Sequence, residues 1–320
     1  MTNRKLLGRE QRISYIDSAK AICIFLMVLG HCLENRILTY YIYSFHMPAM
    51  FILSGILYKP HSWRKTLFAW SIPFLFFSLV SLIVKLIFGE TFSFPDIVFQ
   101  FIHYRYGLGK GLFVGDWFLW ALLGIRFLFG DIGWLKIFRC YYIPIAILTI
   151  IYMTFETYLI SVDTLFRGYY IGRMIPSLPF FCIGLYIKEK GWKPNDLSKY
   201  KVILIALTFI TVPLLNKAYG INGNHYGISY TIFFINATLS SLFIFWISNL
   251  IPSKRFIETI SKGTFVILGA HGPIIYILKH LIPNDITIII PFVTFIICYY
   301  VIILCENYFP MLLGKINIRK

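Results

Sequence analysis

The sequence predicts an all-α fold, a polytopic transmembrane helical bundle that forms one domain over residues 1–320. Three observations predict it: an apolar composition, a series of separate apolar stretches, and an uneven placement of basic residues. Of the 320 residues, 58% are hydrophobic and 14% are charged, and the mean hydropathy is +0.73. Soluble domains are usually about 45–50% apolar and about 25% charged. The composition therefore excludes an ordinary water-soluble protein.

Apolar stretches of helical length recur along the whole chain. A membrane-spanning helix takes about 20 residues, so about ten such helices occupy about 200 positions and leave only short connections. We therefore expect about ten spans and no separate soluble domain. The predicted spans are residues 13–33, 40–58, 67–89, 116–135, 141–160, 174–187, 202–219, 228–250, 264–282 and 286–306.

The basic residues predict the orientation of these spans. If the N-terminus is cytoplasmic, the 30 Lys and Arg divide into 20 on inner segments, 6 on outer segments and 4 inside spans. The six outer residues are Arg36, Arg105, Lys110, Arg167, Arg173 and Lys217. This bias is the positive-inside pattern, which predicts that both termini are cytoplasmic. The net charge of +16 then reflects topology, and we expect no nucleic-acid partner.

The first span, residues 13–33, contains three ionisable side chains: Asp17, Lys20 and His31. Each costs at least about 2.5–3.5 kcal/mol at the centre of a bilayer, so a lipid-facing helix has no reason to keep them. Lys20 and His31 are eleven residues apart. In a helix this spacing places the two side chains within about 20° of the same face and about 17 Å apart along the axis. Asp17 and Lys20 are three residues apart and can pair across a turn. The alternatives are snorkelling of Asp17 and Lys20 to the inner interface, and a structural His31 bonded to a backbone carbonyl.

The second span, residues 40–58, adds His46 two residues before Pro48. Only a short connection separates the first two spans, so they are predicted to be antiparallel neighbours with His31 and His46 at similar depth. Two nearby imidazoles are suited to proton transfer, although they can equally serve to hold helices together.

Later spans carry fewer polar residues, and each has two interpretations. Asp116 and Trp117 open the fourth span and predict either a sugar contact or an ordinary helix start. Arg126 is expected to form a structural ion pair with Glu156. His271, like the nearby Lys279, predicts either a polar pore lining or a helix-packing role.

Two other features complete the prediction. The six cysteines stand singly, which predicts small core residues and neither a disulfide nor a metal site. Residues 107–115 are rich in glycine and lie in the longest outer loop, where we expect a re-entrant or lid segment.

The first two spans resemble a known family. The segments RISYIDSAKAICIFLMVLGH and YSFHMPAMFILSG, within residues 12–58, are similar to the opening of the integral-membrane acyltransferases of acyltransferase family 3. In that family a basic residue lies ten positions before a Gly-His. Lys20 and His31 have this spacing, with lysine where many members have arginine. Weaker similarity continues in TLFAWSIPF, DWFLWAL, SLPFFCIGLYI and GTFVILGAHGPII.

The resemblance implies an O-acyltransferase of the bacterial inner membrane. Its members transfer an acyl group from cytoplasmic acyl-CoA, most commonly acetyl-CoA, to a hydroxyl of a cell-surface polysaccharide or glycolipid sugar. It implies that His31, Asp17 and His46 are catalytic, with His31 as the base and Asp17 acting on the electrostatics of Lys20. The expected partners are acyl-CoA, the sugar or glycolipid acceptor and membrane lipid, with no metal.

The resemblance also implies where the two substrates bind. Lys20, Arg64 and Lys65 are the predicted contacts to the coenzyme, and Asp116 and Trp117 are the predicted contacts to the acceptor. One departure concerns Ala69, which occupies a position near Pro73 where the family commonly has arginine. The sequence therefore does not identify the second coenzyme contact, and Lys201 or Arg255 can supply it from another inner segment.

A proton-coupled transporter or a lipid-linked-sugar flippase is the alternative, because buried Asp, Lys, Arg and His also form proton relays. Two features favour the enzyme. The polar residues concentrate in the first two spans, and no two halves show the matching broken helices of inverted-repeat transporters. Release of free CoA thiol distinguishes the two classes.

Overall fold

The computed structural model describes residues 13–32, 35–60, 62–95, 97, 116–130, 135–159, 169–252 and 254–315. Within these ranges the chain forms helices and no β-strand, with one isolated antiparallel bridge between Gly220 and His225. The all-α prediction is confirmed for the part of the chain that is described.

The part of the chain that the structure describes contains twelve α-helices. They are α1 (Ser14–Cys32), α2 (Arg36–Ile56), α3 (Trp63–Ile87), α6 (Asp116–Leu128), α7 (Lys136–Cys140), α8 (Tyr142–Leu159), α9 (Met174–Lys190), α10 (Lys199–Asn216), α11 (Tyr230–Leu250), α12 (Arg255–Lys262), α13 (Thr264–Leu281) and α14 (Ile290–Tyr308). The 3₁₀ turns are η2 (Tyr170–Arg173), η3 (Pro194–Asp196), η4 (Asn284–Ile289) and η5 (Pro310–Leu313).

Each of the ten predicted apolar stretches contains a helix, and in the described ranges six are long and apolar enough to cross a membrane. The six candidate spans are Ser14–Cys32, Arg64–Ile87, Lys199–Asn216, Tyr230–Leu250, Thr264–Leu281 and Ile286–Tyr308. Two of the other helices are short: α6 has 13 residues and α9 has 17, below the length of about 20 that a full span requires. A total of about ten spans and cytoplasmic termini stay predictions.

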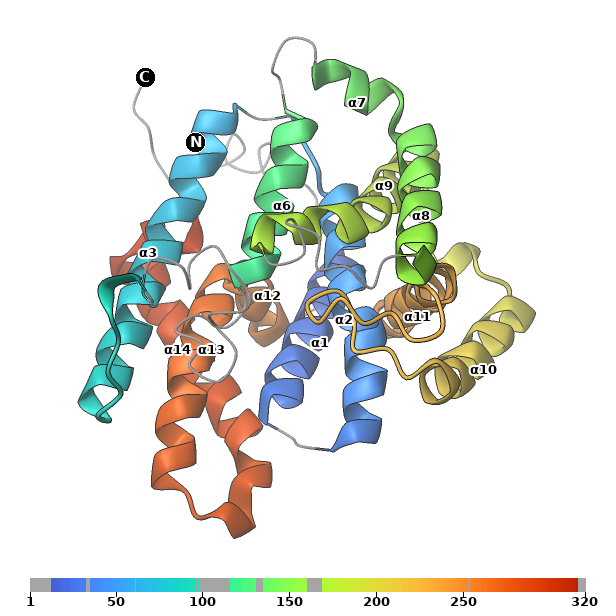
Figure 1. Ribbon diagram of the computed structural model, residues 1–320. Coiled ribbons are helices and arrows are strands. Elements are labelled where there is room, and N and C mark those ends of the chain that lie inside the picture. The colour runs from blue at the N-terminus through green and yellow to red at the C-terminus, as the bar shows by residue number, and fades with distance from the viewer. Residues whose placement is uncertain are drawn as a thin grey trace, which may run out of the picture.

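Helices α1 and α2 lie in the middle of the bundle (Figure 1). Helix α1 packs against α2, α11, α12, α13 and α14, and α2 packs against α9 and α11. Helix α3 lies on one side, against α13 and α6, and α10 lies at the opposite edge, against α11 and α2 (Figure 1). The two helices that carry Asp17, Lys20, His31 and His46 therefore lie inside the bundle.

Helix α1 runs parallel to the α12–α13 segment. Near its start, the Asp17 carboxylate accepts a hydrogen bond from Ser261 Oγ at 2.5 Å. Near its end, the rings of His31 and His271 have centroids 5.3 Å apart. Both contacts advance in the same chain direction, so Asp17 faces α12 and His31 faces α13.

The closest helix contact is the crossing of α2 and α9 at Gly55 and Gly184. A Cβ on Gly55 would lie 2.2 Å from the carbonyl oxygen of Phe181, and one on Gly184 would lie 2.1 Å from that of Ile52. Only glycine allows two helix backbones to approach so closely, as in small-residue interfaces of membrane helices. The Ser-Gly that ends the second motif thus has a packing role.

We expect Gly184→Ala to lower the free energy of unfolding by about 1–3 kcal/mol, because the added methyl group meets backbone atoms that cannot move independently. The measurement is thermal unfolding of the purified protein in detergent. Gly223→Ala is the control, since its Cβ would have no neighbour closer than 3.8 Å. Equal stability of the two variants would contradict this account of the crossing.

Candidate active site

A cavity of about 220 Å³ lies where α1, α2, α6 and α13 meet, beneath the loop that follows α10. Polar and aromatic side chains form much of its wall. The lining residues are Met27, His31, Tyr43, His46, Met47, Trp117, Tyr219, Gly220, Ile221, Asn222, Gly223 and Leu268. The structure therefore brings His31 and His46 to one cavity, as the antiparallel arrangement of the first two spans predicts.

The loop over the cavity is held at its base by Asn216. Its Oδ1 accepts from the backbone N–H of Ile228 at 2.8 Å, and its Nδ2 donates to the carbonyl of Tyr226 at 2.9 Å. Within the loop, Gly220 has a φ of +79°, and a Cβ there would lie 2.6 Å from the carbonyl oxygen of Tyr43. The loop therefore rests directly on α2, beside the histidines. Sequence reasoning did not select it, although Gly220, Gly223 and Gly227 cluster there.

Tyr219 closes the cavity from this loop. Its hydroxyl is hydrogen-bonded to that of Tyr40 at 3.1 Å, and this bond raises the pKa of Tyr219 above its ordinary value. The phenol is therefore neutral near pH 7 and offers a hydroxyl at the edge of the cavity.

The rings of His46 and His271 are held by the same kind of hydrogen bond to their own helix. The Nδ1 of His46 lies 2.7 Å from the carbonyl oxygen of Ile42, and the Nδ1 of His271 lies 2.7 Å from that of Ile267. A carbonyl oxygen only accepts, so each Nδ1 must carry the proton. In the neutral ring this leaves a lone pair on Nε2, which can accept a proton or a hydrogen bond.

His31 lies between these rings. Its ring centroid is 5.3 Å from that of His271 and 6.2 Å from that of Tyr43, which in turn is 5.3 Å from His46. Tyr43 is positioned by a hydrogen bond from its hydroxyl to the carbonyl of Gly30 at 3.1 Å. His271 is fully buried, and its Nε2 has no hydrogen-bond partner among the described residues. The group is thus a cluster of imidazoles with an unused acceptor beside the cavity.

His271 is the site residue that the sequence reasoning undervalued. A signal for it exists, because His46 and His271 both stand two residues before a proline, Pro48 and Pro273. A proline removes an intrahelical hydrogen bond and crowds the carbonyl four residues earlier. For Pro273 that residue is Gly269, where a Cβ would lie 2.4 Å from the Phe77 ring. The repeated His-X-Pro therefore marks two related positions, one on α2 and one on α13, that meet at the site.

The predicted coenzyme contacts lie away from this cluster. Asp17 is buried and bonded to Ser261, about 21 Å along α1 from His31. Lys20 is half-buried on the same helix, and Arg64 and Lys65 are exposed in the first turn of α3. None of these four residues is among those that line the cavity, and their roles towards the coenzyme stay predictions.

The predicted acceptor contacts lie at the start of α6. The helix begins at Asp116, and Trp117 is buried and lines the cavity. The glycine-rich residues 107–115 lie outside the described part of the chain.

Two other predictions need correction. Arg126 lies over the ring of Trp70, with its Cζ 5.2 Å from the centroid, and does not pair with Glu156 in the described part of the chain. The reason is that α8 packs on α9 and α11, whereas α6 packs on α3 and α9. All six cysteines are free, as predicted, but Cys140 is exposed and is not a core residue.

Comparison with known proteins shows the family of the chain. Residues 13–306 match the family model of acyltransferase family 3, described as an acyltransferase domain. The chain therefore belongs to this family of acyltransferases, and its long apolar helices make it an integral membrane protein. No curated protein and no solved structure matches it.

Proposed function

We propose that the protein is a membrane O-acyltransferase. It moves an acyl group, most simply acetyl, from cytoplasmic acyl-CoA to a sugar hydroxyl of a cell-surface polysaccharide or glycolipid. The observation that carries the proposal is the position of His31, which lines the cavity and lies beside His271 in a member of an acyltransferase family. The proposed location is the bacterial inner membrane, with both termini in the cytoplasm.

The proposed reaction is a direct transfer with His31 as the general base. His31 takes the proton of the acceptor hydroxyl while that oxygen attacks the thioester carbonyl. A carbon–oxygen bond forms, and the carbon–sulfur bond of the thioester then breaks. The imidazolium of His31 returns the proton to the departing sulfur. The products are an O-acyl sugar and CoA with a free thiol.

His46 and His271 support this step from two sides. Their Nδ1 protons are committed to the carbonyls of Ile42 and Ile267, so their Nε2 atoms present lone pairs. An acceptor next to His31 stabilises the imidazolium that forms during the reaction, much as a neighbouring acceptor does in other histidine-based catalysts. Held by their own helices, both rings are oriented before substrate binds.

The two substrates approach this centre from opposite ends of α1. Lys20, Arg64 and Lys65 are the proposed contacts to the phosphates of the coenzyme, which stays on the cytoplasmic side. Asp116 and Trp117 are the proposed contacts to the acceptor, by hydrogen bonding and by stacking of a sugar on the indole. The position of Trp117 in the wall of the histidine cavity supports the second assignment.

Release of CoA thiol tests the proposal directly. Membranes that contain the protein and its acceptor receive acetyl-CoA, and free thiol is measured with time. We expect acceptor-dependent thiol release from wild type and from His280→Ala, because His280 is an exposed histidine outside the cavity. Transport of acceptor without thiol release would favour the flippase and would contradict the proposal.

A further inference from the structure

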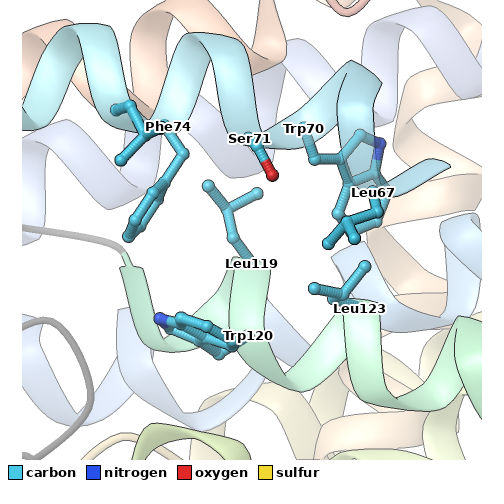
Figure 2. Close-up of a pocket in the computed structure, with 8 residues that line it drawn as sticks. Leu67, Trp70, Ser71, Phe74, Leu119, Trp120 and Leu123 are labelled. Atoms are coloured by element: carbon cyan, nitrogen blue, oxygen red, sulfur yellow. The ribbon is translucent and has the colours of Figure 1, made fainter. Parts of the chain in front are cut away.

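A second cavity, of about 330 Å³, lies between α3 and α6. Figure 2 shows that side chains of the two helices face each other across it, with the Ser71 hydroxyl directed towards α6 and the Trp120 indole on the far side. Apart from Ser71 and the indole nitrogens, the wall is hydrocarbon. It consists of Leu67, Trp70, Phe74, Leu75, Leu119, Trp120 and Leu123.

This cavity continues along α6 into a neighbouring one of about 280 Å³. The two share Leu67, Trp120 and Leu123, and the second also reaches Arg126 and Phe127. Together they form one groove, called here the α3–α6 groove, which is apolar over most of its length and has a guanidinium at one end.

Arg126 has no anionic partner among the residues that the structure describes. Its Nε is buried without a hydrogen-bond partner among the described residues, and no described carboxylate pairs with it. The Nε1 of Trp120, further along the groove, is likewise buried without a described partner. Buried donors and charges are normally satisfied, because leaving them unpaired is costly. The groove therefore presents two unused donors and one positive charge to whatever fills it.

We propose that the α3–α6 groove binds a phosphorylated lipid, with the phosphate on Arg126 and a hydrocarbon chain along Leu67, Leu119 and Leu123. Arginine suits this role because its planar guanidinium binds phosphate through two parallel hydrogen bonds. Leu67, Leu75 and Phe127 line the groove and are exposed. The groove therefore opens on an apolar surface of the kind that faces lipid.

The composition of the groove also favours a lipid over the pantetheine arm of coenzyme A as its ligand. The pantetheine arm carries two amides whose N–H groups would find few acceptors along Leu67, Leu119 and Leu123, and burying such donors unpaired is costly. A lipid chain needs no such partners, and its headgroup supplies the anion that Arg126 lacks. The proposal stands independently of the transfer reaction.

The groove lies directly beside the histidine cavity. Trp120 lines the groove, and Trp117, one turn earlier on α6, lines the cavity. A lipid in the groove would thus extend along the helix that forms one wall of the active site.

Native mass spectrometry of the full-length protein tests the proposal, with dioleoyl phosphatidylglycerol as the probe. We expect one lipid per wild-type chain. In Arg126→Gln we expect the affinity for the lipid to fall by at least about tenfold, because that change removes a charge-assisted contact. Leu123→Trp keeps the charge and fills the groove, so it should lose the lipid as well. Arg36→Gln removes an exposed arginine at the start of α2 and should bind as wild type does.

Size-exclusion chromatography verifies that each variant is folded before lipid binding is measured. Retention of the lipid by both Arg126→Gln and Leu123→Trp at the wild-type level would overturn the proposal. Displacement of the lipid from the wild-type protein by equimolar coenzyme A would also overturn it, because the groove would then belong to the donor.

Discussion

Replacing His31 by alanine is expected to lower the rate of acyl transfer by about 10²–10⁴-fold, the usual cost of losing a positioned general base. His31 lies in the cavity wall, beside His271 and Tyr43, and the proposed reaction brings the acceptor hydroxyl and the thioester to this cavity. The measurement is acceptor-dependent release of CoA thiol at saturating acetyl-CoA. The amount of inserted protein should stay normal, because the side chain lines a cavity and its removal takes away few packing contacts.

His280→Ala is the matched control for this variant. His280 is on α13. Like His46 and His271, it bonds its Nδ1 to the carbonyl four residues earlier, but it is exposed. Full activity of His280→Ala with loss of activity in His31→Ala would separate the cavity from a general effect of removing histidine. A well-inserted and fully active His31→Ala would refute the assignment of the base.

Replacing His271 is expected to produce the second-largest effect, a loss of about 10²-fold. His271→Asn is the informative change, since its amide nitrogen can still donate to the carbonyl of Ile267 while nothing remains at the position of Nε2. If His271 acts through its Nε2 on His31, His271→Asn should fold normally, keep its KM for acetyl-CoA and lose kcat.

A purely structural His271 predicts a different result. His271→Asn would then retain most of its kcat, because the bond to Ile267 is kept, and His271→Ala would instead lower thermal stability. Measurement of kcat, KM and the unfolding temperature for both variants distinguishes the two roles.

The positions of the first two helices and their polar residues could be predicted closely from the sequence. An ionisable side chain in an apolar span is costly wherever it occurs, so Asp17, Lys20 and His31 stand out without any structure. The short connection before Arg36 then places His46 beside His31, and the observed cavity contains both. This part of the site depends on local pattern and on one helix hairpin.

The third histidine could not be placed in this way. His271 is 240 residues from His31 along the chain, and only the parallel packing of α1 on α12 and α13 brings the two rings together. The same holds for Arg126, whose contact with Trp70 depends on the packing of α6 against α3. Hydropathy predicts which helices exist, but it carries little information about which of them become neighbours.

Span lengths show another limit of the pattern. The apolar stretch at 116–135 reads as one span, yet α6 ends at Leu128, followed by a turn at Phe129 and Gly130. Apolar composition continues past the helix end because Phe129 is fully buried in the core. A buried turn and a membrane span therefore have the same hydropathy.

Mass spectrometry of surface glycans tests the central claim most directly. Cells that produce wild-type protein are compared with cells that produce His31→Ala at equal levels, and the released polysaccharides and glycolipids are analysed. We expect the mass increment of an O-linked acyl group, sensitive to mild alkali, on one sugar in wild-type cells and its absence in His31→Ala cells. The same increment in both cell types would contradict transfer at the histidine cavity.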